Sequence, residues 1–231
     1  MKKVFKTISL ILALCFLFVC SVCVNPILNV FSENNGKITI VIDAGHGGID
    51  NGVLGVNTGV KESELNLDIA KKLKCNFQAG GINVKLTRSG EGGLYGLATK
   101  GFKKRDLAKR KEIIEKSGAV VVISIHINKC PYAYRRGVQF FYKIDSEKSR
   151  ELAVDLQNQF NNLPDNVKKS EALAGDYYIL NCTNKISVLA ECGFLSNAED
   201  EKLLLKDEYR AEIAYNIYEV VFGFVLNNLK I

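Results

Sequence analysis

The stretch that decides the fold is AVVVISIH, residues 119–126, an apolar and mostly β-branched run that ends in a histidine. A run this short and this apolar predicts a strand buried on both faces, as in the centre of a parallel sheet. SVLAE, residues 187–191, has the same character and ends in a glutamate. KITIVID, residues 37–43, leads directly into Ala-Gly-His-Gly-Gly. Because helical patterns separate these three runs, we predict an α/β fold.

The remaining elements alternate in the same way. The helix predicted at residues 61–81 has apolar residues at every fourth position, and two glycines end it; the apolar residues are Leu65, Ile69, Leu73 and Phe77. The other patterns predict strands at 82–87 and 137–142 and helices at 103–116, 147–163 and near the C-terminus. This order predicts a single domain with a mostly parallel, twisted sheet flanked by helices on both faces.

The N-terminal segment has a different composition. Two lysines after Met1 are followed by an apolar run from Ile8 to Val24. A basic start and an apolar stretch are typical of a secretory signal or a short membrane anchor. No A-x-A cleavage site follows, so we favour an uncleaved anchor with the rest of the chain outside the cytoplasm. We therefore expect a signal peptide or membrane anchor at 1–24, a linker at 25–36 and the folded domain at 37–231.

Composition and cysteine spacing narrow the class of protein. With 47% apolar and 24% charged residues, the chain has the composition of a globular protein with a core. A net charge of +6 is mild and no recognition motif is present, so we do not expect a nucleic-acid partner. The cysteines outside the N-terminal segment are Cys75, Cys130, Cys182 and Cys192. Their wide, irregular spacing favours free thiols over a disulfide scaffold.

Polar side chains stand where the three buried runs end. His126 and Glu191 end two of them, and His46, the other histidine of the chain, follows the third. Each alone is more often a hydrogen-bonded structural residue. The carboxyl ends of parallel strands, however, meet at one sheet edge, where open α/β folds bind ligands. Two imidazoles and a carboxylate are a ligand set of catalytic zinc, which keeps a fourth position for water. The side chains expected to orient the imidazoles are Asp43, Ser124 and Asn128.

Two further details concern this predicted site. Alternation along a strand turns Cys192 away from Glu191, which argues against a thiolate ligand. Glu62 and Glu64 lie equally near the start of the helix predicted at 61–81, where an acidic residue is favourable in any case. The residues alone therefore leave the choice between these two glutamates open.

Four motifs in order carry a resemblance to a known family: DAGHGG (43–48), KESELNL (61–67), SIHIN (124–128) and LAECGFLSN (189–197). They resemble the successive signatures of zinc-dependent N-acetylmuramoyl-L-alanine amidases of the amidase_3 type. The resemblance extends from Lys37 to the C-terminus and is strongest with the sporulation members of that family. It implies that His46, Glu62 and His126 bind one Zn²⁺ ion and that Glu191 is the catalytic carboxylate.

The same resemblance implies a substrate and a location. The expected reaction is hydrolysis of the amide between N-acetylmuramic acid and L-alanine in peptidoglycan, which removes stem peptides on the way to the muramic δ-lactam of the spore cortex. The expected location is the space between the forespore and mother-cell membranes, and the expected partner is an accessory spore protein. Two alternatives stay open: another zinc-dependent wall peptidase or deacetylase, and a catalytically silent wall-binding regulator.

Overall fold

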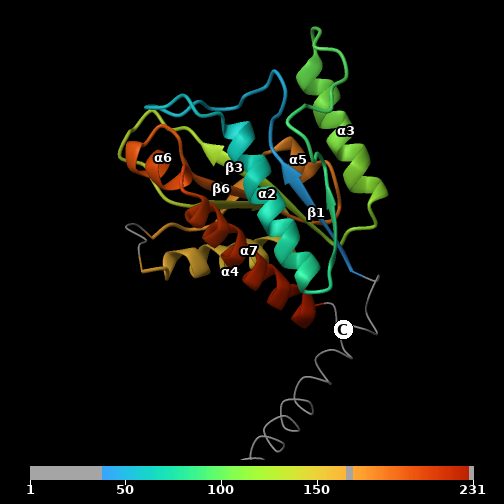
Figure 1. The fold of residues 1–231 in the computed structure, drawn as a ribbon. Coiled ribbons are helices and arrows are strands. Elements are labelled where there is room, and N and C mark those ends of the chain that lie inside the picture. Colours follow the sequence, from blue (N-terminus) through green and yellow to red (C-terminus); the bar gives the residue numbers. More distant parts are fainter. Residues whose placement is uncertain (1–37, 165–168, 229–231) are drawn as a thin grey trace, which may run out of the picture.

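The structure is a computed structural model of the chain and describes residues 38–164 and 169–228. The expected N-terminal apolar segment and linker therefore lie outside the described residues. The elements are β1 (Thr39–Ala44), α2 (Glu62–Ala79), β2 (Asn83–Leu86), α3 (Phe102–Lys116), β3 (Val121–Asn128), β4 (Gln139–Lys143), α4 (Glu147–Asn161), β5 (Leu173–Gly175), α5 (Tyr178–Asn181), β6 (Ile186–Phe194), α6 (Ala198–Leu204) and α7 (Asp207–Asn228). Figure 1 shows their arrangement.

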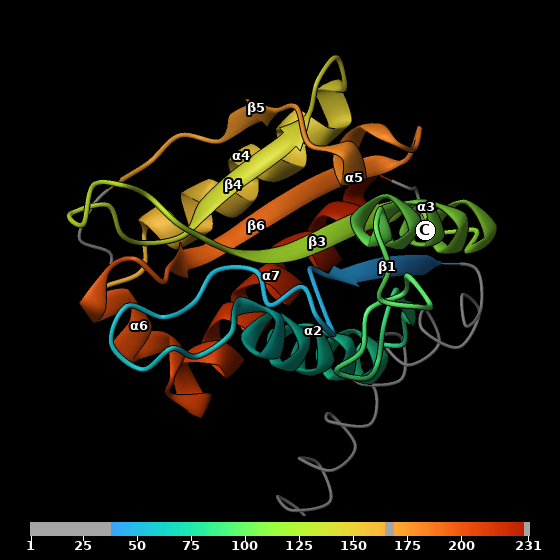
Figure 2. The same ribbon diagram turned by 90° about the horizontal axis from the view of Figure 1, so that it is seen from above.

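The strands of the described residues form one sheet in the order β2-β1-β3-β6-β4-β5. Strands β2, β1, β3 and β6 pair in parallel, β4 pairs antiparallel with β6, and β5 is parallel to β4. Figure 2 shows the twist of this sheet from above. The prediction of a single, mostly parallel sheet is confirmed, with one antiparallel pairing.

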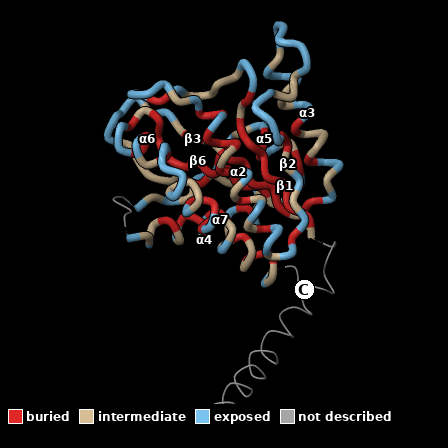
Figure 3. The backbone as a smooth tube through the Cα atoms, in the orientation of Figure 1, coloured by how far each residue is buried: buried red, intermediate tan, exposed pale blue. Residues whose placement is uncertain are grey.

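Helices cover both faces of the sheet. Helices α2, α4 and α7 enclose the larger core, which includes Ile123 and Ile125 of β3. Helices α3 and α5 cover the other face, where Ile114 packs with Val122 and Leu189. Neighbouring residues of a strand point to opposite faces, so the central strands are apolar throughout because both faces are buried. Figure 3 shows this buried centre of the domain.

Helix α2 and the four cysteines agree with the predictions made from the sequence. The apolar residues predicted for one face of α2 are all buried, and the helix ends at Ala79, next to Gly80 and Gly81. Gly81 takes a φ of 76°, which a residue with a side chain rarely adopts. All four cysteines of the described residues are free.

Within the described part of the chain, none of the helices combines the length and apolar content needed to cross a membrane.

Two strand ends were predicted wrongly. Strand β3 continues to Asn128 and β6 continues to Phe194, so His126 and Glu191 lie inside strands rather than at their ends. The ladder continues past a polar side chain because its hydrogen bonds join backbone groups. The extension makes His126 and Glu191 direct neighbours in the register of β3 and β6. Their side chains therefore share one face of the sheet.

Candidate metal centre and its surroundings

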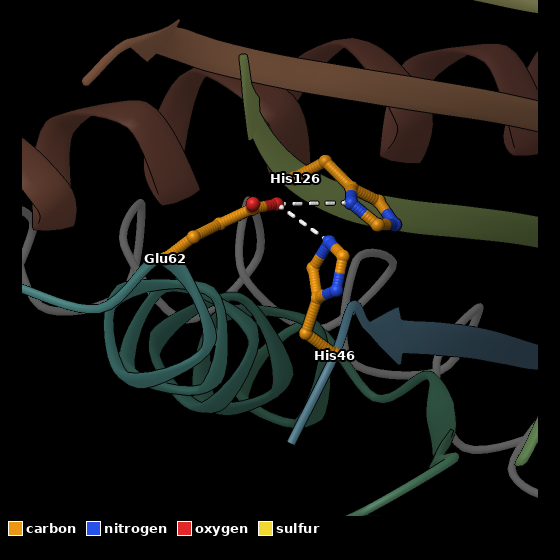
Figure 4. A group of neighbouring side chains, drawn as sticks. All are labelled: His46, Glu62 and His126. Atoms are coloured by element: carbon orange, nitrogen blue, oxygen red, sulfur yellow. Dashed lines mark hydrogen bonds and ion pairs between the residues drawn. The ribbon is translucent and has the colours of Figure 1, made fainter. Parts of the chain in front are cut away.

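Three side chains from distant parts of the sequence meet at the carboxyl-terminal edge of the sheet. His46 follows β1, Glu62 begins α2 and His126 belongs to β3 (Figure 4). Oε1 of Glu62 lies 3.2 Å from Nε2 of His46 and 3.0 Å from Nδ1 of His126. One ligand atom from each residue falls within 4.8 Å of the other two. The structure thus brings together the three residues that the resemblance singled out.

The two glutamates at the start of α2 have different surroundings. The side chain of Glu62 is 2% exposed, whereas that of Glu64 is half exposed and pairs with Lys61 at 3.0 Å. Backbone N–H groups also hold Glu62: Val53 donates to Oε2 at 2.8 Å and Ile127 donates to Oε1 at 3.1 Å. Geometry therefore distinguishes the two glutamates that the sequence left equivalent.

The donor set fits a zinc ion. Atoms bound to tetrahedral zinc at about 2.0–2.2 Å lie about 3.3–3.6 Å from one another. The oxygen-to-nitrogen separations of 3.2 and 3.0 Å are close to this spacing, and all three donor atoms lie within 4.8 Å of one another. Two imidazoles and one carboxylate also leave a fourth position open, as catalytic zinc sites do.

The carboxylates around His46 control its protonation. Burial lowers the pKa of His46, but the hydrogen bonds and charges of Glu62 and Asp50 outweigh burial and raise that pKa to about 9. Burial also raises the pKa of Glu62, but the two imidazoles outweigh it and hold the pKa well below its ordinary value. A metal ion binds the neutral imidazole, so metal binding must displace a proton from His46.

Asp50 orients His46, a role that we did not assign from the sequence. Its Oδ2 lies 2.9 Å from Nδ1 of His46, and its Oδ1 lies 3.4 Å from Nζ of Lys103 on α3. A carboxylate on the far imidazole nitrogen fixes the ring and leaves the other nitrogen for a metal. The expectation that Asp43, Ser124 and Asn128 would do this is wrong: Ser124 donates to Asp43, and Asn128 accepts from the N–H of Lys129.

Two buried arginines hold the backbone that carries His46. Arg110 donates to the carbonyls of Ala44 and His46, both at 2.6 Å. Arg88 donates to the carbonyls of Ala44 and Gly45, both at 2.9 Å. His46 has a φ of 61°, a conformation that costs energy for a residue with a side chain and clusters at functional sites. These four hydrogen bonds stabilise the strained turn and keep the imidazole in place.

A buried aspartate, Asp43, neutralises the charge of Arg110. Its Nη1 lies 2.7 Å from Oδ1 of Asp43, and both side chains are 2% exposed. Thr87 and Ser124 each donate to Asp43 at 2.7 Å. Burial raises the pKa of Asp43, but the charge of Arg110 and these hydrogen bonds outweigh it and lower the pKa to about 2. Asp43 therefore acts on the turn through Arg110, and it does not contact an imidazole.

Gly45 is packed tightly against His126. A Cβ at this position would lie 2.5 Å from Nε2 and 2.7 Å from Nδ1 of the His126 ring. Such distances are far inside van der Waals contact, so only glycine leaves room for the ring. On the other side, Nδ2 of the buried Asn66 donates to the Gly45 carbonyl at 3.3 Å and to Oε1 of Glu62 at 3.1 Å. Asn66 thus joins the first turn of α2 to the turn that carries His46.

Glu191 stands beside this donor group without belonging to it. It is 7% exposed, and its Oε2 has no hydrogen-bond partner among the described residues. Burial raises the pKa of Glu191 to about 7; the charge of Glu62 adds to this effect, and the two imidazoles oppose it. Cys192 is buried in the larger core on the opposite face, in agreement with the expected alternation. A buried carboxylate that titrates near neutrality is suited to exchanging protons.

A cavity of about 240 Å³ adjoins the two imidazoles. It lies between the sheet and helices α3 and α5, and most of its wall is apolar, with contributions from Phe102, Leu107, Tyr177, Ile179 and Leu189. The site is therefore open to a ligand on this side.

Two imidazoles and a carboxylate at the carboxyl ends of its strands place this protein among α/β domains with a candidate metal centre. Comparison with family models is more specific: residues 40–222 match the N-acetylmuramoyl-L-alanine amidase family. The chain belongs to this family.

Individual relatives agree with this assignment. The germination-specific N-acetylmuramoyl-L-alanine amidase of Bacillus subtilis is 34% identical over 194 residues, which cover 82% of this chain and 80% of the relative. The structure of the CwlD amidase from Clostridioides difficile, in complex with the GerS lipoprotein, matches with a TM-score of 0.79 and 36% identity, over 83% of this chain and 100% of that chain. An N-acetylmuramoyl-L-alanine amidase from Clostridium difficile 630 matches with a TM-score of 0.73 and 27% identity, over 83% and 98% of the two chains.

Proposed function

We propose that this chain is a zinc-dependent amidase that hydrolyses the bond between N-acetylmuramic acid and L-alanine in peptidoglycan. The observation that carries the proposal is the meeting of His46, Glu62 and His126 beside the buried Glu191, in a chain of the amidase family. The donor atoms lie close to the ligand spacing of zinc, and two imidazoles with one carboxylate would leave a fourth position for water.

Each residue has a separate role in this proposal. His46, Glu62 and His126 would hold the ion, which, when bound, polarises the scissile carbonyl and lowers the pKa of a water molecule. Glu191 accepts the proton of the attacking water and later donates it to the departing amine of L-alanine. Its buried Oε2 has no hydrogen-bond partner among the described residues, and burial raises the pKa of the side chain; both features support a role in proton transfer.

Two relatives support a proposal for the biological setting. One is a germination-specific amidase, and the structure of the other contains a complex with a lipoprotein. We therefore assign to this chain the removal of stem peptides during spore cortex formation, in the muramic δ-lactam pathway, with an accessory spore lipoprotein as partner. The predicted anchor or signal at 1–24 supports a location between the forespore and mother-cell membranes.

Digestion of defined muropeptides by the full chain, followed by mass spectrometry, tests the reaction. An amidase releases a peptide with a free L-alanine amine and leaves a lactyl carboxylate on the sugar. A deacetylase instead releases acetate and keeps the peptide attached, and a peptidase cuts within the peptide. Either of these products, or no product from a zinc-loaded chain, would contradict the proposed reaction.

A further inference from the structure

Two exposed tyrosines stand on the loop between β3 and β4, residues 129–138. Tyr132 is 62% exposed and Tyr134 is 69% exposed. Their ring centroids lie 5.7 Å apart, with 32° between the ring planes. Aromatic side chains usually bury most of their surface. This pair instead presents an apolar surface that the described residues leave open to solvent.

The loop that carries the two rings is fixed to the segment that follows Glu191. Three hydrogen bonds, spread from its start to its end, join Cys130 N–H to Ser196 Oγ at 2.9 Å, Asn197 Nδ2 to the Ala133 carbonyl at 2.6 Å, and Gly137 N–H to Asp200 Oδ2 at 2.8 Å. The rings are therefore presented on an ordered backbone. A ligand that binds them does not have to order the loop, which favours affinity.

The loop lies near the candidate metal centre. Figure 2 shows it beside α6, at the carboxyl-terminal end of β3, the strand that carries His126. Tyr132 lies six positions after His126, so their Cα atoms are at most about 22 Å apart. A polymeric substrate is therefore long enough to contact the metal centre and the loop at once.

The loop is also positively charged. Lys129, Arg135 and Arg136 lie on it, and the sequence has no acidic residue from 127 to 144. Arg136 pairs with Asp200 at 3.4 Å, and the guanidinium of Arg135 lies 5.8 Å from the ring centroid of Phe194. Within the described part of the chain, neither Lys129 nor Arg135 forms an ion pair. Two cations of the same loop are thus available to an acidic ligand.

We propose that Tyr132 and Tyr134, with Lys129 and Arg135 on the same loop, form a docking platform for the glycan strand of the substrate, an inference that rests on the proposed function. The C–H groups of a sugar ring carry partial positive charge and pack against the negative face of an aromatic ring. Carboxylates on the stem peptides of the same strand complement the two cations. The platform holds the polymer while the metal centre cleaves one of its peptides.

The test compares a double variant, Tyr132→Ala with Tyr134→Ala, with a matched control, Tyr215→Ala on α7. Tyr215 is 55% exposed, and its ring centroid lies 6.1 Å from that of Tyr218, so the control also removes an exposed ring from a ring pair. Each full chain is assayed on intact peptidoglycan and on a soluble single muramoyl peptide. We expect the ratio of kcat/KM on the polymer to that on the fragment to fall about tenfold in the double variant only.

A second measurement is independent of turnover. In a Glu191→Gln background, co-sedimentation with intact peptidoglycan should require about tenfold more glycan for half-saturation when both tyrosines are replaced. An unchanged ratio and unchanged co-sedimentation would overturn the platform, as would an equal loss in Tyr215→Ala. If the unaltered chain cleaved neither substrate, the proposed reaction would fail, and co-sedimentation would still decide whether the tyrosines bind the strand.

Discussion

Replacing Gly45 by alanine adds one methyl group directly against the ring of His126. The φ of Gly45 lies outside the left-handed region, so the backbone accepts alanine and the effect is steric. The new Cβ would lie 2.5 Å from Nε2 and 2.7 Å from Nδ1, against about 3.5–4.0 Å for ordinary contact. The ring must therefore retreat by about 1 Å, while a metal–ligand distance tolerates only about 0.2 Å.

We expect Gly45→Ala to weaken zinc binding by about 100-fold or more, because changes in groups that merely support a ligand already cost about 10- to 100-fold. Overpacking should also lower the free energy of unfolding by about 1–3 kcal/mol. Competition with a chromophoric chelator gives the affinity, and thermal melting gives the stability. Gly90→Ala is the matched control, since its Cβ meets nothing within 4 Å. Wild-type zinc affinity in Gly45→Ala would refute the assignment of His126 as a ligand.

Three further outcomes follow from the surroundings of the site. Asp50→Asn should weaken zinc binding by about 10- to 100-fold, and an unchanged chelator titration would mean that Asp50 does not support His46. Zinc binding at pH 7 should release the proton of His46, since the pKa of this side chain is about 9, in addition to any proton from zinc-bound water. Calorimetry in buffers of different ionisation enthalpy measures the total, and a total below one proton would contradict His46 as a ligand. Asp43, whose pKa falls from 3.8 to about 2 on folding, contributes about 2 kcal/mol of stability that is present above pH 4 and lost as the pH falls through 2. The stability difference between the wild type and Asp43→Asn should shrink by that amount over this range, and a constant difference in denaturant titrations would contradict it.

The sequence predicts the fold well because its strongest signals come from burial on two faces. The apolar runs of β1, β3 and β6 and the four-residue spacing in α2 follow directly from packing between two helical layers. Short elements were missed: β5 has three residues and α5 has four, too few for any periodicity to show. The predicted strands ended at His126 and Glu191, before the observed ends of β3 and β6. In sequence alone, a polar residue after an apolar run looks like the end of a buried strand.

The site was predictable only in part, for a related reason. The two histidines could be predicted as site residues because a polar, titratable side chain is unusual at the end of a buried apolar strand. Glu62 required the family resemblance, since its difference from Glu64 depends on which face of α2 turns towards the sheet. Arg88 and Arg110 gave no signal, because nothing in the sequence distinguishes a buried arginine from an exposed one. Asp50 lies four residues after His46, and only the tight turn of residues 46–50 brings the two together.

The central claim is that Glu191 transfers protons beside a zinc ion held by three other side chains. The most direct test is Glu191→Gln, which keeps the shape of the side chain but cannot accept a proton. Zinc content, melting temperature and turnover on a defined muropeptide are measured on the same preparation. We predict full zinc occupancy, a stable fold and a fall in turnover of about 10²- to 10⁴-fold. Near-normal turnover with full zinc would contradict the claim, and loss of zinc would make Glu191 a ligand and call for a new role for Glu62.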